Sequence, residues 1–84
     1  MTDKFYLPNL TDSKQITFEE YFVEDLAAVY FTTVPNSFYS LIGFRFKDGS
    51  VVELDNEILI TMSFDSENTE LLQKIQKVIQ MFHP

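Results

Sequence analysis

The segment 47–50 (Lys-Asp-Gly-Ser) is the strongest turn signal in the chain, and it constrains how the residues on either side can pair. Before it, residues 37–46 alternate between two faces, one of which carries Phe38, Ile42, Phe44 and Phe46. A two-residue loop would place Glu53 on this aromatic face, whereas a three-residue loop with Gly49 in the left-handed conformation places Val52 and Leu54 there. Because a slip of one residue turns every side chain over, we expect the three-residue loop.

A third alternating segment follows at residues 58–64, where Ile58, Ile60, Met62 and Phe64 alternate with Leu59, Thr61 and Ser63. Residues 55–57 (Asp-Asn-Glu) have the composition of a turn between strands. The alternation therefore predicts a three-stranded antiparallel meander with a strongly apolar face.

Residues 17–30 carry two competing signals. Thr17 and Glu20 match the capping box of a helix, and apolar residues follow at helical spacing, namely Phe18, Phe22, Leu26 and Val29. The same segment is rich in Phe, Tyr, Val and Thr, which favour strands, so a strand pair at 15–23 and 26–34 is the alternative. We expect the helix, with Glu20 and Glu24 on its solvated face.

The two ends of the chain complete the pattern. Residues 67–82 form the clearest helix, capped by Asp65 or Ser66, with a buried stripe of Leu71, Leu72, Ile75, Val78, Ile79 and Phe82. Residues 4–7 form a short edge strand that Pro8 ends. The predicted fold class is α+β: a single domain spanning residues 1–84, in which a three-stranded antiparallel meander packs with a helix in the N-terminal half and a C-terminal helix.

Composition excludes several kinds of function. The 84 residues contain no Cys, which excludes disulfide scaffolds, cysteine-ligated zinc and thiol nucleophiles. Only two Gly are present, so the glycine-rich loops that hold nucleotide phosphates are excluded as well. Thirteen aromatic residues provide the core of a small domain instead.

The titratable residues do not form a catalytic pattern. His83 is the only imidazole, and residues 65–70 resemble a calcium loop without its glycine and its bidentate acid. Acid pairs on residues 19–25 are expected to be solvated rather than placed in a cleft. We therefore expect no enzymatic activity, no metal site and no cofactor.

Charge is the feature that stands out. The formal net charge is −7, and eleven of the thirteen acidic residues lie in the stretches 15–44 and 48–73, which contain no basic residue. The six Lys and Arg are scattered, which argues on electrostatic grounds against direct binding of nucleic acid or of a membrane surface. A rigid surface of carboxylates could instead bind a basic protein surface.

The leading hypothesis is therefore a non-enzymatic protein-binding module. It would act as an acidic inhibitor or decoy of a basic, nucleic-acid-binding surface on a larger protein, and a phage or another mobile element would encode it. The residues expected to bind this partner are Glu19, Glu20, Glu24, Asp25, Asp55 and Glu57.

The alternative hypothesis is a structural or adaptor domain that forms homo-oligomers such as a homodimer. It would use the second face of the sheet, with Tyr39, Leu41 and Leu59 as contacts. The N-terminus has no signal-peptide pattern and no apolar stretch approaches 18 residues, so a cytoplasmic location is expected.

Overall fold

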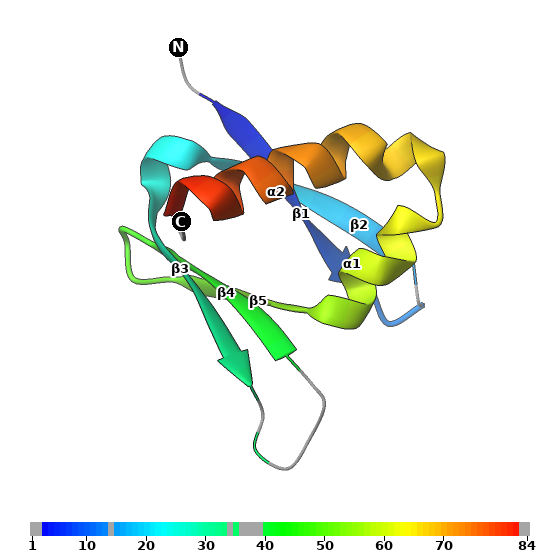
Figure 1. Ribbon diagram of the computed structural model, residues 1–84, viewed down its shortest axis with the longest axis horizontal. Coiled ribbons are helices and arrows are strands. Elements are labelled where there is room, and N and C mark those ends of the chain that lie inside the picture. Colours follow the sequence, from blue (N-terminus) through cyan, green and yellow to red (C-terminus); the bar gives the residue numbers. More distant parts are fainter. Residues whose placement is uncertain (1–2, 14, 34, 36–39, 83–84) are drawn as a thin grey trace.

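The computed structural model describes residues 3–13, 15–33, 35 and 40–82. The fold is α+β, as predicted, and Figure 1 shows its helices and strands. In chain order these are β1 (Lys4–Leu10), β2 (Ile16–Phe22), the 3-10 turn η1 (Val23–Asp25), β3 (Leu26–Thr33), β4 (Ser40–Phe46), β5 (Val51–Asp55), α1 (Asn56–Ser63), the 3-10 turn η2 (Ser66–Asn68) and α2 (Thr69–Phe82).

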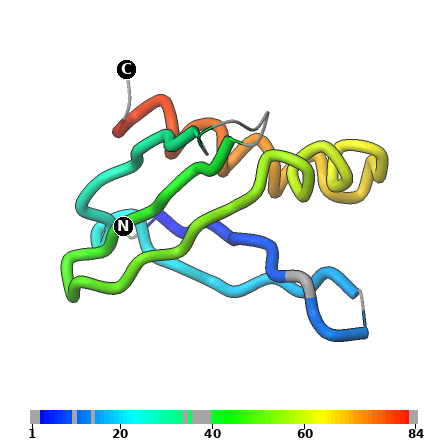
Figure 2. Tube along the Cα trace, turned by 90° about the horizontal axis from the view of Figure 1, so that it is seen from below, coloured from blue at the N-terminus to red at the C-terminus, as the bar shows by residue number. Residues whose placement is uncertain are grey.

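The strands form two separate antiparallel sheets. One is the hairpin β1–β2, and the other is the three-stranded sheet β3–β4–β5. Helix α2 packs chiefly against β1 and also contacts β3 and α1. Figure 1 shows α2 crossing in front of β1, and Figure 2, turned by 90°, shows the hairpin as a layer apart from the other three strands.

Side chains from both sheets and both helices meet in one core. Phe5 and Leu7 of β1 are completely or almost completely buried, as are Phe44 of β4, Met62 of α1 and Ile75 of α2. The ring of Phe5 lies close to three other rings, with centroid distances of 5.8 Å to Tyr21, 6.1 Å to Phe44 and 6.4 Å to Phe46. Because these partners belong to both sheets, Phe5 joins the hairpin to the larger sheet.

The predicted β4–β5 hairpin is confirmed, including its register. Phe44 pairs with Val52, the Phe46 N–H donates to the Ser50 carbonyl at 2.9 Å, and three residues form the loop. Gly49 has φ of 93°, which places it in the left-handed region that a glycine adopts without strain. Burial of the aromatic face therefore selected the register, as the alternation predicts.

The helix expected at residues 17–30 is wrong, and the alternative strand pair is correct. These residues form β2, η1 and β3, which pair with β1 and β4 respectively. The Thr17/Glu20 capping box is therefore a coincidence, since both residues lie within β2. Apolar residues four apart also share one face of a strand, so Phe18 and Phe22 suit either structure, and pairing with β1 favours the strand.

The strand expected at residues 58–64 is also wrong, because residues 56–63 form α1. Asp55 is not in a turn: it ends β5, and its carboxylate accepts a hydrogen bond from the Glu57 N–H at 2.8 Å as the N-cap of this helix. Within α1, Met62 is buried and Ile58 packs against the core, a spacing of four that suits a helix as well as a strand.

The chain ends agree with the sequence more closely. Helix α2 presents the predicted stripe to the core, and the Asp65 carboxylate caps η2 just before it by accepting from the Glu67 N–H. The N-terminal strand is longer than expected, since β1 continues through Pro8 to Leu10. Pro8 pairs with Phe18, between the residue pairs that exchange hydrogen bonds, so its missing N–H removes no bond to β2.

Removal of the Phe5 ring should destabilise the fold severely. Phe5→Ala is expected to lower the free energy of unfolding by about 3–5 kcal/mol, because the side chain is fully buried and a cavity would remain. This is a large part of the roughly 4–13 kcal/mol expected for a domain of this length. Urea denaturation followed by circular dichroism measures the change.

Phe64→Ala is the matched control, because the Phe64 side chain is 85% exposed. It should change the free energy of unfolding by no more than about 0.5 kcal/mol. Equal effects of the two substitutions would contradict the central position of Phe5 in the core.

Candidate functional site

Three adjoining cavities follow β5 from the β4–β5 turn to the start of α1. The first, of about 500 Å³, lies between β2 and the turn, and the second, of about 220 Å³, lies between the hairpin β1–β2 and β5. The third, of about 360 Å³, lies between the ends of β1 and β5 and the first turns of α1. Tyr21 lines the first two, and Pro8 and Asn9 line the last two, so together they form one shallow groove.

The groove has an apolar floor and an acidic rim. Leu7 and Leu54 are buried in its floor. Among the residues that the structure describes, its lining contains a single basic residue, Lys47, and seven acidic residues: Glu19, Glu20, Asp25, Asp48, Glu53, Asp55 and Glu57. We call it the acidic groove.

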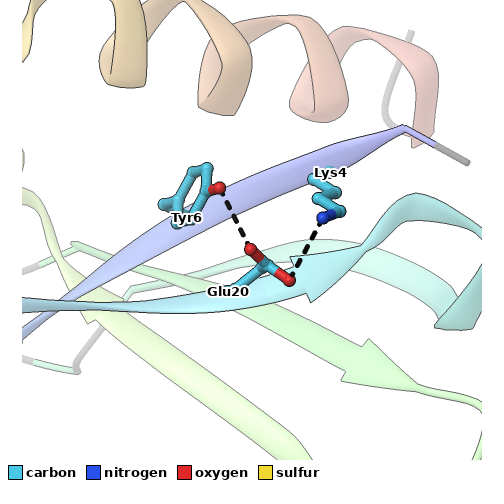
Figure 3. Close-up of polar contacts among 3 residues, drawn as sticks. All are labelled: Lys4, Tyr6 and Glu20. Carbon is cyan, nitrogen blue, oxygen red and sulfur yellow. Dashed lines mark hydrogen bonds and ion pairs between the residues drawn. The ribbon is translucent and has the colours of Figure 1, made fainter.

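Glu20 is held within its own hairpin (Figure 3). Its carboxylate accepts a hydrogen bond from the Tyr6 hydroxyl at 3.1 Å and lies 3.6 Å from Lys4 Nζ. The hydrogen bond to Glu20 raises the pKa of Tyr6 above its usual value. Because the ion pair is exposed, it adds little stability, but it places a positive charge beside Glu20.

Glu19 contacts the aromatic residue at the centre of the groove. Its carboxylate accepts a hydrogen bond from the Tyr21 hydroxyl at 2.9 Å, while the Tyr21 ring stacks on Phe46 at 4.9 Å. Burial, and then the hydrogen bond to Glu19, raise the pKa of Tyr21 to about 12. Tyr21 is therefore a neutral hydrogen-bond donor across the physiological pH range.

The other predicted acidic residues divide into three kinds. Asp25 and Glu57 are exposed and have no side-chain hydrogen bond or ion pair within the described part of the chain. Asp55 is occupied as the N-cap of α1. Glu24 is exposed on η1 but does not line the groove. The structure thus brings together five of the six acidic residues predicted from the sequence.

Two groove acids were not predicted as site residues. Asp48 accepts hydrogen bonds from the Ser50 N–H at 2.8 Å and the Ser50 hydroxyl at 2.6 Å, and these bonds lower its pKa. Glu53 is exposed on β5. The three-residue loop already placed Glu53 on the face opposite the core, so its exposure, though not its position beside the hairpin, could have been read from the sequence.

The alternative interface is only partly assembled. Tyr39 lies outside the described residues, and Leu59 lies on α1, where it packs against the core rather than on a sheet face. Leu41 is half-buried on the outer face of β4, opposite the core. That face also carries Val51, which is 46% exposed, and the half-buried Tyr30.

Two negative observations apply to the described residues alone. Among them, no three His, Cys, Asp or Glu side chains are grouped so as to hold a metal ion. No helix they form has the length and apolar character needed to cross a membrane.

Comparisons of the chain with family models, curated proteins and solved structures found no significant match.

The raised pKa of Tyr21 predicts a specific loss of stability at high pH. Its folded pKa of about 12 exceeds the usual value of 10.0, so its contribution is complete below pH 10 and is lost as the pH rises toward 12. In a titration followed by phenolate absorbance, Tyr21→Phe should remove one transition near pH 12. Glu19→Gln should lower the pKa of Tyr21 only in part, since burial remains.

If Tyr21→Phe instead removed a transition near pH 10, this result would contradict the hydrogen bond and the burial assigned to Tyr21. Tyr30→Phe is the control, since it should leave the transition near pH 12 unchanged.

Proposed function

We propose that the protein is a non-enzymatic binding module that holds a basic region of a larger protein in the acidic groove. We further propose that it acts as an inhibitor or decoy, by occupying a surface that otherwise binds nucleic acid. The observation that carries the proposal is that, among the described residues, seven acidic residues and one lysine line a single groove, and only Glu20 of the seven is paired with a lysine.

Electrostatics supports a protein partner. A surface lined with charges of one sign attracts the opposite charge, accelerates association and gives a strong salt dependence. The 46% exposed Val51 and the half-buried Ile58 also line the groove, and they supply apolar surface that a partner side chain could bury. Asp25 and Glu57, whose side chains have no partner among the described residues, are available for ion pairs.

The shape of the site favours one form of this function. A mimic of the nucleic-acid backbone has to enter the partner's binding cleft, so its charges should stand on a convex surface. Here the carboxylates border a concave site, which favours a basic strand or loop of the partner entering the groove. The decoy would then act by covering the basic residues that contact phosphates.

Charge neutralisation within the groove tests the proposal. The variant Asp25→Asn/Glu53→Gln/Glu57→Gln removes three groove charges that make no side-chain contact in the described residues. Immobilised protein should retain its partner from a cell lysate about 5- to 30-fold less well after this change, at roughly 0.3–0.7 kcal/mol per lost ion pair. Wild-type retention should fall as salt is raised, and added duplex DNA should displace the protein from its partner.

The matched control is Asp12→Asn/Glu67→Gln/Glu70→Gln, which changes the net charge equally at exposed positions outside the groove. It should retain the partner almost as well as the wild type. Equal losses of partner retention in the two variants would mean that net charge, and not the groove, is responsible. Retention that does not depend on salt would refute the electrostatic proposal.

A homo-oligomeric structural or adaptor domain is the second candidate. It is favoured by the outer face of the sheet β3–β4–β5, where Leu41 is half-buried and Val51 is 46% exposed, because the core lies wholly on the other face. Sedimentation over a range of concentrations should reveal a dimer, and Leu41→Ser/Val51→Ser should dissociate it. A monomer at every concentration would refute this function.

A further inference from the structure

The edge of β5 beside the acidic groove has backbone groups that no described strand uses. In the sheet order β3–β4–β5, the strand β5 has β4 on one side and no strand on the other. The bond from the Phe46 N–H to the Ser50 carbonyl makes these two residues a hydrogen-bonded pair. Since such pairs alternate in an antiparallel ladder, Val52 and Leu54 bond to β4, whereas Val51 and Glu53 direct their N–H and C=O groups away from it.

The groove follows this free edge rather than one face of the strand. Its central cavity is lined by the inward-facing Val52 and Leu54 and also by the outward-facing Val51 and Glu53. No hydrogen bond from another described residue reaches the outward N–H or C=O of Val51 or Glu53. An unpaired strand edge of this kind is a template for an added strand.

Charge decides which strand fits. A second copy of β5, added antiparallel about a two-fold axis centred at Glu53 or at Leu54, would place Glu53 beside Glu53 or Asp55, and like charges directly opposite each other are destabilising. A segment with lysine or arginine would instead face Glu53 and Asp55 from one side and Glu19 from the hairpin side. Both rims of the groove therefore complement a basic strand.

We propose that an extended, lysine- or arginine-bearing segment of the partner binds along the free edge of β5 as a fourth strand of the sheet β3–β4–β5. Its backbone pairs with Val51 and Glu53, and its basic side chains meet the carboxylates of the groove. This inference rests on the proposed function and specifies its mode of recognition, in which hydrogen bonds supply affinity and charge supplies selectivity.

Two capped synthetic peptides of alternating lysine and threonine test the backbone pairing on the full-length protein. In one peptide the backbone is unmodified, and in the other the amides along one edge are N-methylated, which keeps the charge but removes the donors. The unmodified peptide should bind at low salt and slow hydrogen exchange of the Val51 and Glu53 amides about tenfold or more. N-methylation should weaken binding at least about tenfold, the equivalent of losing two net hydrogen bonds.

A substitution pair provides the same test from the protein side. Val51→Pro removes an outward donor without changing charge and leaves the bonds of Val52 to β4 in place, whereas Val51→Ala keeps the donor. Only Val51→Pro should weaken binding of the unmodified peptide, by about fivefold for the loss of one hydrogen bond. The circular dichroism spectrum checks that both variants retain the fold.

The outcomes separate this inference from the proposed function. Equal binding of the two peptides, without slower exchange at Val51 and Glu53, would refute strand addition while leaving an acidic, protein-binding groove. Failure of both peptides to bind at low salt would refute strand addition and the binding of basic segments together.

Discussion

The contact between the two sheets through Phe5 is the interaction on which the rest of the molecule depends. Among the described residues, no backbone ladder links the hairpin β1–β2 to β3–β4–β5, so packed side chains largely fix their relative position. The Phe5 ring does so by contacting Tyr21 on its own hairpin together with Phe44 and Phe46 on the larger sheet. Aromatic rings suit this task in a short chain, because each buries a large area and loses little side-chain entropy.

This mode of packing also explains why a groove exists. Aromatic packing holds the sheets together near Phe46, while along β5 the inner face of the hairpin stands opposite a strand edge with which it does not pair. Backbone polar groups at this edge need water or a partner, and the charged rim keeps them accessible. A backbone hydrogen bond from the Lys47 N–H to the Asp25 carbonyl, at 2.9 Å, joins the β4–β5 turn to η1 and closes the groove at this end.

The sequence predicted those elements in which burial alone decides the structure. The register of the β4–β5 hairpin follows from keeping Glu53 off the aromatic face, and α2 follows from its single apolar stripe. Segments 17–30 and 58–64 could not be assigned in this way, since an apolar spacing of four fits one face of a helix and one face of a strand. There the outcome depended on more than apolar spacing: pairing with β1 stabilises β2 as a strand, and the Asp55 cap stabilises the start of α1 as a helix.

The acidic site shows the same division between local and long-range information. Five of the six acidic residues predicted from stretches without basic residues line the groove, although the helix face that was expected to present Glu20 and Glu24 does not exist. The carboxylates instead come from β2, η1, the β4–β5 turn, β5 and α1, and only the packing of the two sheets brings them together. Concentrated negative charge opposes compaction, so a basic segment in the groove would relieve repulsion between the very elements that form it. By linkage, a partner that binds only the folded chain would then stabilise the packing around Phe5 on which the groove depends.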